Sequence, residues 1–234
     1  MERKGDDTLR PADLETSLDI SNLLYLENKE SNVVVERTQK IQYADRPVNK
    51  AEDVLVINFQ TGSDYISFKD SHLRLVLNLF KQDKTTPSVS GDKNTFGVWG
   101  SVLNIMRTIR IISRAGDVIA QVDSANLLNF YKVNYEHKER WKFQQGKALI
   151  GWTSSTGEHL NGTNEFLIPL QLICSFFELH SLSPSQLCKG MRLEISLENP
   201  AVAFVQPTPG QAADTLGTYT VTGCQLHLDS YSLT

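Results

Sequence analysis

The chain has 234 residues, of which 40% are hydrophobic and 21% are charged, and its formal net charge is −4. This apolar content can bury a core, so wholesale disorder is excluded, and the length suits one large domain or two small ones. The three cysteines are too few and too irregularly spaced for a disulfide scaffold, and the absence of a C-x-x-C pair excludes a zinc ribbon.

The N-terminal residues carry no apolar segment of the kind that directs secretion. The most apolar run, residues 166–177, is shorter than the roughly 20 residues of a membrane-spanning helix. We therefore expect a soluble protein with no membrane span, whose thiols stay reduced inside a cell.

Residues 1–32 form the first predicted unit, an acidic N-terminal arm. They hold eight acidic and four basic residues, so the whole net charge lies here and residues 33–234 are neutral. Packaging of nucleic acid by a flexible arm needs many Lys and Arg residues, because these neutralise phosphates. The acidic arm therefore argues against such packaging and against sequence-specific nucleic-acid binding. Its leucines have partly helical spacing, and four are predicted to dock on another surface: Leu18, Leu23, Leu24 and Leu26.

Residues 33–234 form the second predicted unit, in which apolar residues alternate with polar ones. Alternation of this kind is typical of antiparallel strands with one buried face. In the first expected strand, 33–42, the residues Val33, Val35 and Ile41 share one face, and Gln42 points the other way. Further strands are expected at 53–60, 65–70, 72–80, 107–114, 118–122, 166–172, 191–197 and 219–229.

Short helices interrupt this pattern. Residues 101–106 can form one helical turn, and 123–135 suit a short helix with apolar residues at Leu127, Leu128, Tyr131 and Tyr135. With eight or nine strands, few helices and no repeat of fixed period, the sequence predicts an all-β antiparallel sandwich. Its long loops favour a jelly roll with an extended N-terminal arm.

Three stretches resemble viral jelly-roll capsid proteins, particularly those of icosahedral DNA viruses. Residues 64–75 are similar to the strand pair near the start of such capsomers. Residues 99–116 are similar to the short helix and strand that follow. The run Leu167-Ile168-Pro169-Leu170, with Leu182-Ser183-Pro184 and residues 191–195, resembles their later strands. The resemblance extends from about residue 33 to the end, and the length corresponds to a single roll or to one half of a double jelly-roll capsomer.

The sequence offers no support for an enzyme. It contains no G-x-S-x-G elbow, no G-x-G-x-x-G, no P-loop and no H-E-x-x-H. The five histidines are scattered, and His72 and His227 are expected on outward strand faces, exposed or paired across strands. The cysteines are expected to be core residues: Cys174, Cys188 and Cys224. We expect no catalytic residue, no metal site and no cofactor.

Residues 132–147 form the most basic stretch, and they hold the candidate contact residues Lys132, Lys138, Arg140, Trp141 and Lys142. One hypothesis is that this stretch binds nucleic acid, with Trp141 or Phe143 stacking on bases. The hypothesis that we favour is a solvated connection whose charges meet the acidic arm of a neighbouring copy.

The resemblance implies a structural protein, a capsid subunit that assembles with copies of itself into an icosahedral shell. Other capsid proteins are further partners, and the location would be the virion, assembled inside the host cell. The alternative is a β-sandwich recognition module, lectin-like or receptor-binding, that holds a ligand with the loops 82–94, 151–164 and 199–217.

Overall fold

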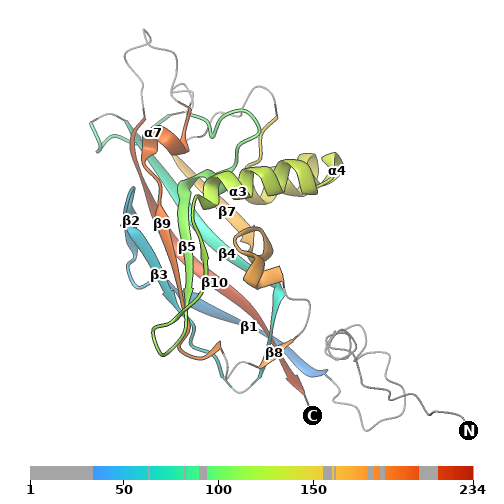
Figure 1. Ribbon diagram of the computed structural model, residues 1–234. Coiled ribbons are helices and arrows are strands. Elements are labelled where there is room, and N and C mark those ends of the chain that lie inside the picture. The colour runs from blue at the N-terminus through green and yellow to red at the C-terminus, as the bar shows by residue number, and fades with distance from the viewer. Residues whose placement is uncertain are drawn as a thin grey trace, which may run out of the picture.

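The computed structural model describes residues 34–62, 64–81, 83–89, 94–154, 160, 162–178, 182–184, 188–205 and 216–233. The acidic arm 1–32, with the four leucines predicted to dock, lies outside these residues. The described part of the chain folds into two antiparallel sheets that enclose one hydrophobic core (Figure 1).

The first sheet has the strand order β1-β10-β4-β7, with β2 paired to β10 and β8 paired to β4. Its strands are β1 (Val34–Tyr43), β2 (Val48–Lys50), β4 (Tyr65–Lys81), β7 (Thr163–Pro169), β8 (Ser183–Pro184) and β10 (Leu216–Leu233). The second sheet has the order β3-β9-β5-β6. Its strands are β3 (Val54–Asn58), β5 (Met106–Ile112), β6 (Val118–Val122) and β9 (Arg192–Leu197).

The core is built by the alternations that the sequence predicts most clearly. Along β4, Leu73, Leu75, Leu77 and Leu79 are all at most 2% exposed, and from β9 Leu193 and Ile195 are equally buried. Strand β5 pairs with β6 as the predicted hairpin, closed by a turn at residues 114–117. These predictions are confirmed. The inward faces of the two sheets pack against each other and form the core of the sandwich.

Strand β4 differs from the prediction, because the segments 65–70 and 72–80 form one strand of 17 residues. A bulge separates them: Ser67 pairs with Asp229 and His72 with His227, so five residues of β4 pass while β10 advances by two. The Ser71 hydroxyl fills the gap, since it donates to the Ser67 carbonyl (2.5 Å) and accepts from the Asp229 amide (3.0 Å). The extra residues change the buried positions from even to odd numbers.

The predicted face of β1 is wrong. Ile41 is 41% exposed, whereas Gln42 is buried. The reason is a side-chain contact that imitates a strand pair: Gln42 Nε2 donates to the carbonyl of Gln60, 2.9 Å away, and Gln42 Oε1 accepts from the Gln60 amide at 3.3 Å. A buried polar side chain with both groups satisfied competes well with an isoleucine at a sheet edge. Val33 lies outside the described residues.

Helices cover one end of the sandwich. The predicted turn at 101–106 is the 3-10 helix η2 (Val102–Ile105), capped by the Ser101 hydroxyl. The remaining short helices near the sheets are η5 (Leu170–Leu172), η6 (Ser175–Glu178) and α7 (Pro200–Ala203). The predicted strand 166–172 therefore ends at Pro169 and continues as η5.

Residues 125–150, which we call the helical layer, are helical almost throughout. They comprise α3 (Ala125–Tyr131), the π-helix η3 (Lys132–Glu136), α4 (Glu139–Trp141), the π-helix η4 (Lys142–Gly146) and α5 (Lys147–Ile150). The basic stretch 132–147, expected as a solvated connection, thus lies within helical turns. Contacts of α3 with β5 and η2, and of α5 with β7, hold the layer on the sandwich (Figure 1).

Candidate functional site

The helical layer turns its large apolar side chains toward solvent. Helix α3 forms as predicted, yet Leu127, Leu128, Tyr131 and Tyr135 are 55%, 53%, 52% and 75% exposed. We call these four residues the aromatic face. The face that packs against the sandwich carries Ala125, Asn129 and Val133 instead. Small and polar residues there allow close approach of the helix to η2 and β5, so the apolar periodicity identifies the helix but not its buried side.

Two cavities flank the aromatic face and share Tyr135 as a lining residue. The larger, about 470 Å³, lies between the helical layer and η6, with Leu128, Tyr131, Ile173 and Cys174 in its wall. The smaller, about 350 Å³, is lined by Trp99, Lys142, Phe143 and Trp152. The surface is therefore hollowed on both sides of one exposed tyrosine.

Two of the candidate lysines hold the layer in place. Lys132 Nζ donates to the carbonyl of Gln171 (2.7 Å) and forms an ion pair with Glu178. Lys142 Nζ donates to the carbonyl of Asn134 (2.8 Å) and lies 5.8 Å from the centre of the Trp152 ring. Both ammonium groups have partners within the chain. Their first role is therefore to stabilise the helical layer, and a ligand would have to compete with these partners.

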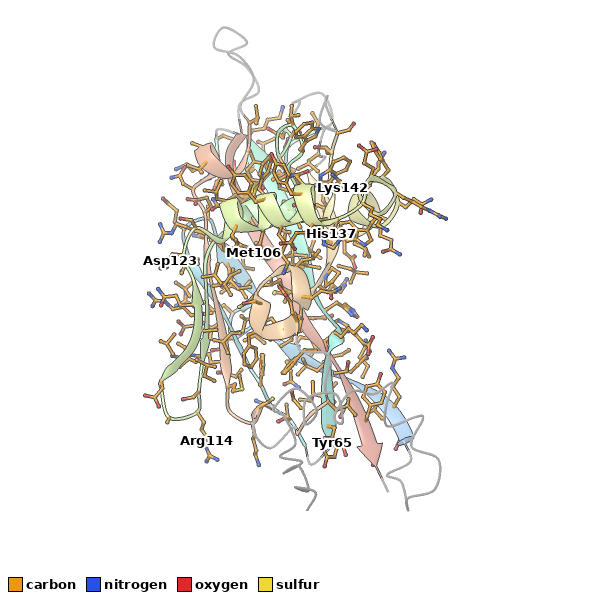
Figure 2. All side chains as sticks on the ribbon, turned by 45° about the vertical axis from the view of Figure 1, so that its right-hand side comes forward. Tyr65, Met106, Arg114, Asp123, His137 and Lys142 are labelled. Carbon is orange, nitrogen blue, oxygen red and sulfur yellow. The ribbon has the colours of Figure 1, made fainter. Side chains whose placement is uncertain are left out.

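The other two candidate bases are exposed. Lys138 and Arg140 form no ion pair with any residue in the described ranges. Figure 2 shows the neighbouring His137 and Lys142 in the upper part of the molecule, with Tyr65 near its lower end. Lys138 and Arg140 are therefore the candidate residues whose charge is free to meet a partner.

Trp141 is not free to stack on a base. Its ring stacks on His137, with centroids 4.0 Å apart, and a Cβ atom on Gly146 would lie 3.0 Å from it. Burial lowers the pKa of His137, which favours the neutral ring in this stack. Phe143 is 55% exposed and meets Trp152 edge to face. Of the two predicted stacking residues, only Phe143 presents much of its ring to solvent.

Trp99 is the surface residue that sequence reasoning missed. It is 50% exposed and has a positive φ of 59°. Asn134 fixes this arrangement, since its Nδ2 donates to the carbonyl of Trp99 and its Oδ1 accepts from the indole of Trp152, each at 3.0 Å. All three tryptophans of the chain therefore lie in or beside the helical layer. Trp99 precedes the layer by more than 25 residues, and no local pattern connects them.

The structure brings together two of the histidines. His72 and His227 stack on neighbouring strands, which confirms the expected cross-strand arrangement. His159 and His180 lie outside the described residues. Within the described ranges no cluster of His, Cys, Asp or Glu has the arrangement of a metal site, and no helix there is long and apolar enough to cross a membrane.

The cysteines are core residues, as predicted. All three are buried, and burial raises the pKa of Cys188 to about 11 and that of Cys224 to about 12. A thiol with a raised pKa is a poor nucleophile at neutral pH, because only the thiolate attacks.

The loops of the recognition-module hypothesis are described only in part. A cavity of about 570 Å³ lies where the ends of two of them meet, lined by residues that include Lys84, Asn199 and Gly217. Lys50 and Glu52 add one charge of each sign to its wall. The cavity is separate from the helical layer.

No protein-family model matches the chain, and no curated protein matches its sequence. Solved structures do match. A quasi-atomic model of the PBCV-1 virus capsid aligns with a TM-score of 0.52 and 11% identity, over 90% of this chain and 45% of the other. The crystal structure of PBCV-1 VP54, fitted into a reconstruction of the virophage Sputnik, aligns with a TM-score of 0.51, 11% identity and the same coverage.

This chain thus spans less than half the length of the capsid chains that it matches. At 11% identity the likeness concerns the backbone fold, and it extends over 90% of this chain. The chain has the jelly-roll fold of viral capsid proteins.

Proposed function

We propose that this protein is a non-enzymatic capsid subunit that assembles with copies of itself into the icosahedral shell of a virion. The observation that carries the proposal is the match of 90% of the chain to capsid structures. The exposed aromatic face supports it, because a monomer gains nothing from four large apolar side chains in water. Coverage of 45% of the matched chains agrees with a single roll or one half of a double capsomer.

The physical basis is that the core and the outer surfaces of the sandwich serve different purposes. The sandwich encloses a hydrophobic core within one chain, which leaves its outer surfaces for contacts between copies. Symmetry then repeats one interface many times, and closure of a shell multiplies contacts that are individually weak. Other capsid proteins would bind by the same surfaces.

Light scattering after size-exclusion chromatography, with negative-stain microscopy of the same fractions, tests the proposal on the full chain. We expect concentration-dependent oligomers and closed particles. An absorbance spectrum typical of clean protein would agree with shell assembly that needs no bound nucleic acid. A protein that remains a monomer at every concentration would contradict the proposal.

The second candidate function is recognition of a small ligand or glycan. It is favoured by one observation, the cavity of about 570 Å³ where residues 84, 199 and 217 meet. A monomer that binds members of a glycan array, and loses that binding when Asn199 is replaced by Ala, would favour this alternative over the capsid subunit.

A further inference from the structure

We propose that the N-terminal arm of one copy, residues 1–32, docks on the helical layer of a neighbouring copy. The arm's Leu18, Leu23, Leu24 and Leu26 would cover the aromatic face, and its acidic residues would meet Lys138 and Arg140. This inference rests on the proposed self-assembly, and it names the segment and the surface that form one of the contacts.

The apolar part of the argument is the match between an exposed surface and a segment that can cover it. The aromatic face and Phe143 are each more than half exposed, and a cavity lies on either side of Tyr135. The arm offers leucines within a stretch of nine residues, 18–26. A short apolar segment that enters a hollowed, aromatic surface is a recurring mode of peptide recognition.

The opposite net charges of the arm and the helical layer favour this surface over the rest of the molecule. Residues 132–147 contain five bases and two acids, a net charge of +3, whereas residues 1–32 carry −4. The rest of residues 33–234 must then carry −3, because these residues together are neutral. The helical layer is therefore the cationic part of an otherwise acidic chain, and it attracts the arm while the remaining surface repels it.

The position of Val34 favours the arm of a neighbour over that of the same copy. Val34 pairs with Leu233, beyond the pairing of Tyr231 with Tyr65. Figure 2 places Tyr65 near the lower end of the molecule and His137 and Lys142 in its upper part. The eight residues from Leu26 to Val34 span at most about 26–29 Å. The arm of each copy is therefore attached at the Tyr65 end of the sandwich, away from its own helical layer.

Disulfide trapping in the full chain tests which surfaces meet. A variant with Leu23→Cys and Tyr131→Cys should give reducible cross-linked dimers and larger species on mild oxidation, and mass spectrometry should find a disulfide-linked peptide that joins positions 23 and 131. The three natural cysteines are buried, and Cys174, which lines the larger cavity, is replaced by Ala in both variants. The matched control combines Leu23→Cys with Ile119→Cys on β6, which is 47% exposed and carries no part of the helical layer.

Each result of the trap decides the proposal. A cross-link between copies in the first variant and not in the control supports it. A cross-link within one copy would contradict docking on a neighbour. Equal cross-linking in both variants, or none in either, would contradict the assignment of the helical layer as the docking surface. If reduced protein forms particles while the trap fails, the capsid function stands and only the docking fails.

Peptide binding tests the charge argument without requiring assembly. A fluorescent peptide of residues 1–32 is titrated into full chain diluted until light scattering shows monomers. Tryptophan emission should shift together with the peptide anisotropy, because all three tryptophans lie at the helical layer and the arm contains none. The double variant Lys138→Glu, Arg140→Glu should bind about three- to tenfold more weakly, since exposed ion pairs are individually weak.

The matched control is Lys69→Glu, Lys189→Glu, which changes the net charge equally at exposed positions outside the helical layer. Its affinity should fall less than that of the first variant. Raising NaCl from about 0.1 M to about 1 M should weaken binding without abolishing it, because screening leaves the leucine contacts intact. Equal affinity of both variants, or no binding at low salt, would overturn the proposal whether or not the protein assembles.

Discussion

His72 and His227 stack face to face across strands β4 and β10, with ring centroids 4.7 Å apart and ring planes inclined by 14°. His227 is held between two glutamines: its Nε2 lies 3.2 Å from Gln225 Oε1, and its Nδ1 lies 3.2 Å from Gln39 Oε1. Gln225 Oε1 also accepts from Arg74 Nη1, so both ring nitrogens of His227 face amide oxygens, which are acceptors, and a neutral ring can donate to only one of them. The pair belongs to a polar row that crosses β4, β10 and β1.

This arrangement predicts a pH-dependent stability. Burial, His72 and Arg74 lower the pKa of His227, and Asp229 opposes them. The pKa in the folded chain thus lies below the value of about 6.5 in the unfolded chain. The unfolded chain binds the proton first on acidification, so the free energy of unfolding should fall as the pH drops from about 6.5 through the folded pKa.

Urea unfolding of the wild type and of His227→Gln, at about pH 7 and about pH 5, measures this effect against the linkage relation. The variant should lose less stability between the two values. His72→Gln should also lose less, because it removes one of the charges that lower the His227 pKa. His137 has a lowered pKa in every one of these proteins, so its contribution cancels. Parallel losses in the wild type and both variants would contradict the prediction.

Truncation of the sandwich core should be costly. Leu75 is 2% exposed and Leu193 is fully buried, so Leu75→Ala and Leu193→Ala should each lower the free energy of unfolding by about 2–5 kcal/mol. Ile41→Ala is the matched control on the same sheet, because Ile41 is 41% exposed. We expect a change within about 0.5 kcal/mol for it. A larger loss in Ile41→Ala than in Leu75→Ala, measured in urea, would show that the faces are assigned wrongly.

The side chain of Gln42 should contribute to the stability of the sandwich edge. Gln42→Ala removes both hydrogen bonds to the backbone of Gln60, and we expect it to cost about 1–2 kcal/mol. Glu36→Ala, an exposed position on the same strand, should change little. Equal unfolding midpoints for the two variants would mean that the glutamine contact contributes nothing.

Replacing a paired lysine of the helical layer should cost more stability than replacing an exposed one. Lys132→Ala loses the bond to the Gln171 carbonyl and the ion pair with Glu178, and should cost about 1–2 kcal/mol, reduced by the exposure of Glu178. Lys138→Ala should stay within about 0.5 kcal/mol of the wild type, because Lys138 is exposed. Thermal unfolding followed by circular dichroism compares them, and a reversed order would contradict the assigned contacts.

The sequence predicts the sandwich well because period-two alternation is a local property that one buried face imposes. Leu73 to Leu79 and residues 193–197 are predicted correctly for this reason. Gln42 could not be predicted, because its partner Gln60 lies in another segment and only the fold brings them together. The union of 65–70 with 72–80 was hidden by the bulge, which interrupts the alternation within one strand.

The candidate site is predictable only in part. The run of bases at 132–147 is visible in the sequence, but which of them are free depends on distant partners: Gln171 and Glu178 hold Lys132. The same holds for the aromatic face, since helical spacing gives two possible buried sides. The smaller side of α3, with Ala125, faces the sandwich because it permits closer packing.

The bulge in β4 also determines where the chain can change in length. Deletion of one residue between Leu73 and Leu79 would turn every later side chain of the strand to the opposite face, so leucines would enter water and polar groups would enter the core. Deletion of Lys69 or Asp70, both exposed within the bulge, would shorten the unpaired excess and leave the pairings on either side in place. Insertions and deletions in this strand should therefore be tolerated at residues 69–70 and rejected a few positions further along.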